Sequence, residues 1–107
     1  MTTINQNENL FTLINVFHVN PANQQELVDL LIKATEETMR NLSGFISANI
    51  HQSLDGKQVV NYAQWESKEH FQKMLSNSSA IPHMKKAEEL VNSFEPIQTE
   101  VVDSISM

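Results

Sequence analysis

The chain has 107 residues, of which 40% are hydrophobic and 19% are charged, and its formal net charge is -6. The seven Lys and Arg residues are scattered and there is no cysteine, so we expect no binding to nucleic acid or to an anionic membrane, no disulfide and no thiolate chemistry. The polar N-terminus resembles no secretory signal and no apolar run reaches the roughly 20 residues of a membrane span, so a cytoplasmic location is expected.

The first strand follows a polar N-terminus. Residues 1–8 are predicted to form a flexible arm, and residues 9–107 a single domain. From residue 10 to residue 19 the chain reads LFTLINVFHV, a composition typical of a strand. Both alternating sets of side chains are apolar, with Val16 in one set and Phe17 in the other. A strand with two apolar sides needs cover on both.

A long helix is predicted after this strand. Asn20 is expected to cap it and Pro21 to occupy its first position, where the missing N–H costs nothing. Apolar residues recur at helical spacing as far as Leu42, which indicates a continuous helix of about 20 residues. Gly44 is expected to end the helix in the left-handed conformation.

A β-hairpin is predicted next. Residues 45–54 alternate as one strand, and residues 58–66 form the returning strand. Between them, Asp55 and Gly56 are expected to be the two central residues of a type I′ turn, which requires positive φ at both positions.

Two further helices and a last strand complete the chain. Ser67 is expected to cap the second helix, and residues 77–79 to interrupt the helical segment. The third helix is predicted from one apolar stripe, made of Met84, Ala87, Leu90, Val91 and Phe94. Pro96 should end that helix, and residues 97–105 should form the last strand.

The predicted order β-α-β-β-α-α-β indicates an α+β, ferredoxin-like fold: an antiparallel four-stranded sheet with helices on one face. The first strand still needs cover on its other face. A second copy of the chain can supply it, so we predict a homodimer whose sheets pack face to face.

One cluster on the returning strand suggests chemistry. Asn61 and Trp65 are four residues apart and therefore share a face, with the small Ala63 between them. A carboxamide and an indole N–H in one space can bind and polarise a ligand oxygen. The alternative is that Trp65 only packs in the core and Asn61 satisfies a neighbouring loop.

Four histidines are the other candidates. No pair has a metal-binding spacing, so no metal site is expected. His51 and His83 are candidate proton acceptors, and His83 opens a helix, which would keep its imidazole neutral. Surface or packing roles are the alternative for all four, including His18 and His70.

The stretch from about Leu10 to Leu75 resembles the antibiotic biosynthesis monooxygenase (ABM) domain, a family of dimeric α+β barrels. The resemblance is carried by GFISANIHQSLDGKQVVNYAQWES and by the helix that begins KEHF. The segment NYAQW is similar to the cofactor-free, quinone-forming oxygenases of polyketide pathways, which implies that Asn61 and Trp65 line a site between sheet and helices. Such enzymes tend to carry a tyrosine where this chain has Phe71.

The resemblance implies a cofactor-independent monooxygenase that oxidises a small phenolic, quinol or polyketide-like aromatic substrate with dioxygen. A phenolate in a dry pocket can itself reduce dioxygen, so no cofactor is expected. The expected catalytic residues are Asn61, Trp65, His51 and His83. The expected substrate-binding residues are Asn15, Phe17, Phe71, Met74 and Met84.

Two alternatives remain open. In the first, the chain is a non-catalytic module of the same fold, either a small-molecule binder or a dimeric partner module. In the second, it is a monooxygenase that binds or degrades haem. For the haem alternative, the resemblance implies a pair formed by Asn15 and Trp65, with His70 or His83 as the axial ligand.

Overall fold

The computed structural model of the protein describes residues 10–107. Its elements in chain order are β1 (Phe11–Val19), α1 (Gln24–Glu37), β2 (Phe45–Gln52), β3 (Gln58–Trp65), α2 (Lys68–Leu75), α3 (Ile81–Leu90) and β4 (Val91–Thr99), with 3-10 turns at Pro21–Asn23 and Met39–Asn41. The predicted arm, residues 1–8, lies outside the described residues, so the division of the chain into arm and domain stays a prediction.

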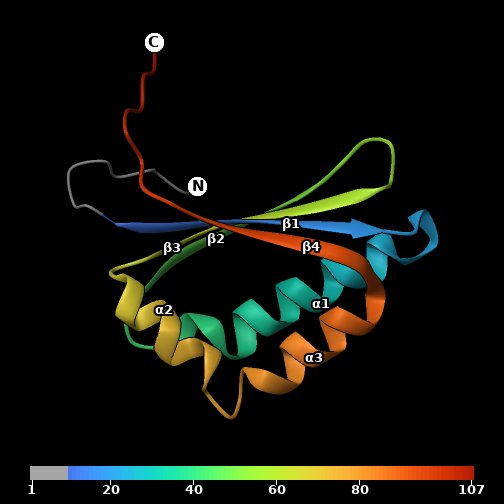
Figure 1. The fold of residues 1–107 in the computed structure, drawn as a ribbon, viewed down its shortest axis with the longest axis horizontal. Helices are drawn as coiled ribbons and strands as arrows, with labels where there is room; N and C mark the ends of the chain where they lie inside the picture. The colour runs from blue at the N-terminus through green and yellow to red at the C-terminus, as the bar shows by residue number, and fades with distance from the viewer. Residues whose placement is uncertain (1–9) are drawn as a thin grey trace.

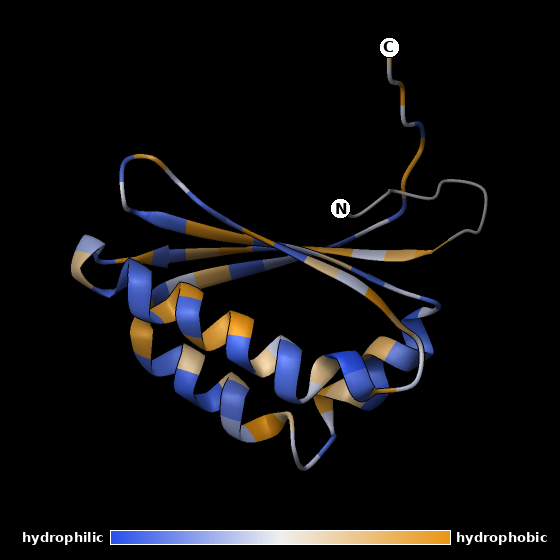
Figure 2. Ribbon diagram, turned by 180° about the vertical axis from the view of Figure 1, so that it is seen from behind, coloured by the Kyte–Doolittle hydropathy of each residue, from blue (hydrophilic) through white to orange (hydrophobic). Residues whose placement is uncertain are grey.

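The four strands form one antiparallel sheet in the order β2-β3-β1-β4. All three α-helices lie on one face of this sheet (Figure 1). Figure 2 shows the same two layers from behind, with hydrophobic and hydrophilic residues interleaved along each helix. The predicted ferredoxin-like α+β fold is confirmed. We call the face covered by the helices the helical face, and the other the open face.

The two sides of β1 differ in their cover. Leu13 and Phe17 are buried on the helical face, whereas Ile14 and Val16 on the open face are only half-buried. Among the described residues, no helix or strand covers the open face (Figure 1). The described residues therefore leave Ile14 and Val16, on the second apolar side of β1, only half-buried.

The first helix is shorter than predicted. Asn20 caps the 3-10 turn Pro21–Asn23 that leads into α1, and not α1 itself: its Oδ1 accepts a hydrogen bond from the Ala22 N–H at 3.0 Å. The α-helix ends at Glu37, since Thr38, with φ -125° and ψ -64°, leaves the helical conformation. Gly44 is left-handed, with φ 84°, but it lies in the turn into β2. The prediction of one continuous helix ended by Gly44 is therefore wrong.

The β2–β3 hairpin is confirmed, but the type I′ turn is wrong. The connection runs from Ser53 to Lys57, and the Gly56 N–H donates to the Ser53 carbonyl at 3.2 Å, which places Asp55 and Gly56 third and fourth in the turn. The Asp55 carboxylate accepts from the Ser53 hydroxyl at 2.7 Å and the Lys57 N–H at 3.0 Å. These hydrogen bonds lower the pKa of Asp55. They also favour the connection Ser53–Lys57 over a two-residue type I′ turn.

The helical segment after β3 is broken where predicted. Ser67 caps α2, because its Oγ accepts from the His70 N–H at 3.2 Å. The interruption follows Leu75, where the Asn77 carboxamide oxygen accepts from the Ser79 N–H at 2.8 Å. The break is thus an Asx-type turn between two helices.

The boundary between α3 and β4 was predicted wrongly. Val91 and Phe94 lie on β4 and not on the third helix, and β4 ends at Thr99 instead of extending over 97–105. The apolar stripe kept a helical period across a real helix–strand boundary, which misled the prediction. Pro96 lies inside β4 and is tolerated because β4 is an edge strand.

Two apolar clusters fill the space between the layers. One surrounds Trp65 and Phe71, and the other surrounds Leu27 and Val59, which are fully buried. Members of both clusters line the cavity between the layers. Within residues 10–107, no helix is both long and apolar enough to cross a membrane.

Candidate functional site

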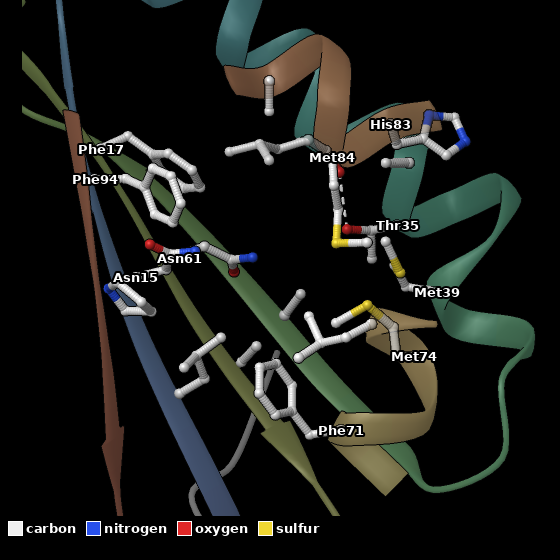
Figure 3. A pocket seen from close by; sticks show the side chains of 18 of the residues that line it. Asn15, Phe17, Thr35, Met39, Asn61, Phe71, Met74, His83, Met84 and Phe94 are labelled. Carbon is white, nitrogen blue, oxygen red and sulfur yellow. Dashed lines mark hydrogen bonds between the residues drawn. The ribbon is translucent and has the colours of Figure 1, made fainter. Parts of the chain in front are cut away.

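A cavity of about 360 Å³ lies between the helical face of the sheet and the helices (Figure 3). That volume lies within the range of small-molecule sites, about 300–1,000 Å³. Its lining is mostly apolar. The polar members of the lining are Asn15, Thr35, Asn61, His83, Glu88 and Gln98.

The strand β3 places its residues in this cavity by simple alternation. Asn61, Ala63 and Trp65 all line it, as expected for every second residue of a strand. Ala63 leaves room between the amide and the indole. The predicted juxtaposition of Asn61 and Trp65 in one space is therefore present.

A second amide stands beside Asn61. The register of β1 and β3 pairs Asn15 directly with Asn61, and Figure 3 shows the two carboxamides next to each other. The Oδ1 atoms of both are buried and have no hydrogen-bond partner. A buried polar group left unsatisfied costs about 1–3 kcal/mol. A ligand hydroxyl that donates a hydrogen bond to one of these oxygens would therefore satisfy it.

Aromatic rings form one end of the cavity. Trp65 is 2% exposed, and its ring meets that of Phe45 edge-on, with centroids 5.4 Å apart at 87°. The ring centroid of Phe71 lies 6.5 Å from that of Trp65 and 5.1 Å from that of Phe11, on which it stacks. Such rings offer flat walls to a flat ligand. Phe71 contributes a phenyl face here and no hydroxyl.

A second aromatic pair stands beside the two amides. The rings of Phe17 and Phe94 are 6.1 Å apart and tilted by 32°. The contribution of β4 to the site is not predicted from the sequence, because the apolar period assigns Phe94 to a helix. The spacing of Phe94, Pro96 and Gln98 by two residues is the signal that could have found it.

The helical side of the cavity carries Met39, Met74 and Met84 (Figure 3). Met74 and Met84 were predicted to bind substrate, while Met39 was not. Thr35 is also on this side, and its hydroxyl donates to the Leu31 carbonyl of its own helix at 2.8 Å. That hydroxyl is therefore not free to donate to a ligand.

The two candidate histidines occupy different places. His83 lines the cavity, but Figure 3 shows its ring turned away from the amides, and its Nε2 lies 3.2 Å from the Thr38 Oγ1. His51 is exposed on the open face, where its Nδ1 hydrogen bonds to the Asn49 carbonyl at 3.1 Å. The structure therefore brings His83 to the rim of the site and leaves His51 outside it.

The cavity is nearly free of titratable groups. His83 and Glu88 are the only ionisable side chains among its described lining residues, and Glu88 is exposed. Apart from these two groups, the described lining around Asn15 and Asn61 is uncharged. A buried anion there would be stabilised by oriented N–H dipoles rather than by a countercharge.

The described residues offer little to a metal or to haem. Within residues 10–107, no three His, Cys, Asp or Glu side chains gather in a metal-binding group. His70, one of the two axial ligands considered, is not in the lining, and its Nδ1 lies 2.7 Å from the Ser67 Oγ. The ring of His83 is turned away from the cavity.

The fold and the cavity together define a ferredoxin-like α+β protein with a mostly apolar internal cavity that holds two adjacent carboxamides. Comparison with known proteins narrows the class. The chain belongs to the antibiotic biosynthesis monooxygenase family, whose model matches residues 10–90.

Individual relatives are similar over nearly the whole chain. Tetracenomycin-F1 monooxygenase of Streptomyces glaucescens is 45% identical over 104 residues, which are 97% of this chain and 92% of the relative. The crystal structure of the monooxygenase ActVA-Orf6 of Streptomyces coelicolor, in complex with nanaomycin D, aligns with TM-score 0.85 and 28% identity over 94% of each chain. SnoaB, a cofactor-independent oxygenase of Streptomyces nogalater, has the same fold, with TM-score 0.78 and 20% identity over 92% of this chain and 99% of SnoaB.

Proposed function

We propose that the protein is a cofactor-independent monooxygenase that converts a polycyclic phenol of polyketide type into a quinone. The observation that carries the proposal is the placement of Asn15, Asn61 and Trp65 around one apolar cavity, with two amide oxygens left unsatisfied. The substrate class is supported by the 45% identity to tetracenomycin-F1 monooxygenase and by the likeness to ActVA-Orf6, whose structure holds nanaomycin D.

The proposed reaction needs no external reductant. The phenol, once ionised, gives one electron to dioxygen, and the two radicals combine into a carbon-bound hydroperoxide. Loss of water from the hydroperoxide gives the quinone. One oxygen atom enters the ring and the other leaves as water, while the phenol loses two hydrogens. The protein has to bind the phenol, favour its anion and keep water away.

The residues of the cavity have separate roles in this reaction. The Asn61 N–H₂ donates to the developing oxyanion, and Asn15 holds a neighbouring oxygen of the substrate. The Trp65 indole N–H donates to the substrate or to the peroxide oxygen. Phe17, Phe71, Met74 and Met84 hold the flat ring system by contact. His83, at the rim, is the proposed proton acceptor; its ring, which is turned away from the amides, has to rotate toward the substrate for this role.

Oxygen uptake tests the proposal. With 1-naphthol and 9-anthrol as probes, we expect protein-dependent uptake of one O₂ per quinone, measured with an oxygen electrode and by quinone absorbance. With ¹⁸O₂, one labelled oxygen should enter the quinone. Uptake no faster than with heat-denatured protein, for every two- to four-ring phenol tried, would reject an oxygenase.

The same experiment separates the alternatives. A non-catalytic binder would quench the fluorescence of Trp65, the single tryptophan, on adding the phenol, without oxygen uptake. A haem protein would develop a Soret band when titrated with haemin. The relatives, which are monooxygenases, favour the oxygenase over both alternatives.

We further propose that two copies pair through their open faces. Ile46 and Ile97 on that face are 41% and 45% exposed, and sheets with apolar faces pack on each other. The last residues add to this argument: Val102 and Ile105 are almost fully exposed, and the C-terminal segment leaves the sheet on the side away from the helices (Figure 1). A second copy on the open face would meet this segment. Location in the cytoplasm stays a prediction of the sequence.

Replacing Ile97 by glutamate is expected to shift the protein from dimer to monomer, because the charge would be desolvated between the sheets. Light scattering at low micromolar concentration measures the mass. The matched control is Leu54→Glu, since Leu54 is fully exposed in the β2–β3 turn, and it should leave the mass unchanged. A monomeric wild type would reject the pairing.

A further inference from the structure

We propose that the methionines of the cavity are sites of turnover-linked oxidation, at which the peroxide formed on the substrate is intercepted as methionine sulfoxide. The inference rests on the proposed function, because that reaction supplies the oxidant. It assigns a modification site to the helical wall of the cavity and sets a limit on the number of turnovers.

The arrangement of the methionines carries the inference. Three of the five methionines of the chain, Met39, Met74 and Met84, line this one cavity. All three belong to or pack against the cluster of buried residues around Trp65. Figure 3 shows their thioethers on the helical side, across the cavity from the strands that carry Asn15 and Asn61. A hydroperoxide held by the amides would therefore face sulfur on the opposite wall.

The chemistry favours sulfur as the acceptor. A thioether is oxidised by a hydroperoxide to a sulfoxide, and the chain has no cysteine to compete. The hydroperoxide O–O bond breaks and its outer oxygen forms the S=O bond. Sulfur loses two electrons, and the peroxide is reduced to a hydroxyl group. The substrate then leaves as a hydroquinone instead of a quinone, so one hydroquinone accompanies each sulfoxide.

Oxidation would also change the site. A sulfoxide is polar, whereas the wall that these methionines form is apolar. Each event would place a strong hydrogen-bond acceptor against the flat face of the ligand. Affinity for an apolar ring system should fall, and the enzyme should lose activity in proportion to the sulfoxide formed.

The test compares cavity methionines with Met107, which is fully exposed at the C-terminus. The protein is allowed about 100 turnovers of 9-anthrol under ¹⁸O₂ with catalase present, and the peptides are mapped by mass spectrometry. We expect ¹⁸O-labelled sulfoxide at one or more of Met39, Met74 and Met84, at about five times the level at Met107. With hydrogen peroxide alone and no substrate, Met107 should carry more sulfoxide than the cavity methionines, because it is more accessible to solvent.

A variant supplies a second readout. Leucine preserves most of the volume of methionine, so a protein with Met39→Leu, Met74→Leu and Met84→Leu should complete about three times more turnovers before inactivation. The number of turnovers is compared, not the initial rate.

Several results would overturn the inference. Three results with oxygen uptake would remove the inference and leave the proposed function standing. They are no sulfoxide in the cavity, oxidation of Trp65 alone, or oxidation of Met107 as fast as that of the cavity methionines. No oxygen uptake with any phenol removes both.

Discussion

Replacing Asn61 by alanine is expected to lower kcat/KM for the oxidised phenol by about 10²–10³-fold, because loss of one preorganised donor to a developing anion costs about 2.7–4 kcal/mol of barrier. The loss should fall mainly on kcat, since the donor acts on charge that develops during the reaction. Oxygen uptake over a range of phenol concentrations separates the two constants. Trp65→Phe, which keeps an aromatic ring and removes the N–H, should lower kcat in the same direction.

The matched control is Asn49→Ala. Asn49 lies on the neighbouring strand β2 and its amide donates to the Tyr62 carbonyl at 3.1 Å, but it is not among the residues that line the cavity. It should keep kcat/KM within about twofold, as expected of a residue remote from the chemistry. If Asn61→Ala were as active as this control, Asn61 would have no part in the mechanism.

Replacing Gly44 by alanine is expected to cause a larger loss of stability than replacing Gly56, the other glycine of the chain. Gly44 has φ 84°, which costs an L-residue about 1–2 kcal/mol. The added Cβ would also lie 2.6 Å from the Cβ of His70 and overlap its ring, at a further cost of about 1–3 kcal/mol. Urea unfolding followed by the fluorescence of Trp65 measures the change.

Gly56→Ala is the control that separates the two costs. Gly56 has a similar φ of 81°, but its added Cβ would lie 3.4 Å from Pro21, so only the backbone cost applies. Removing the ring in a Gly44→Ala, His70→Ala double variant should recover most of the steric cost. Comparisons at one protein concentration avoid a contribution from dimerisation. If Gly44→Ala and Gly56→Ala lowered stability equally, the His70 side chain would have to move aside for the added methyl group at no energetic cost.

The architecture could be predicted because its signals are local. Composition identified β1 and alternation identified the hairpin. Asn20 and Ser67 capped the segments that follow them, and the order of elements then selected the ferredoxin-like topology. The type I′ turn predicted at Asp55–Gly56 was wrong, because side-chain hydrogen bonds of Ser53 and Asp55 compete with the two-residue turn.

The end of α3 was mispredicted for a different reason. Val91 and Phe94 continue an apolar period that began in the helix, yet they pair with β1. A strand forms there because β1 offers an unpaired edge and the chain returns alongside it. Helical propensity is a weak local preference that such pairing overrides.

The position of His51 depended on an irregularity of β2. The pairing of β2 with β3 shifts between Phe45 and Ser47, and a shift of one residue moves all later side chains to the other face. Phe45 therefore faces the helices, while His51 faces away from them. The sequence carries no distinct signal for this bulge.

By itself, the sequence determined which residues of one strand share a face, since strand geometry alternates every two residues. It therefore placed Asn61 and Trp65 together. Only the tertiary structure decided that Asn15 stands opposite Asn61, that β4 completes the lining, and that the three methionines gather on the helical side of the cavity. Those contacts join segments far apart in the chain, and they follow from strand register and helix packing, which arise only when the layers assemble.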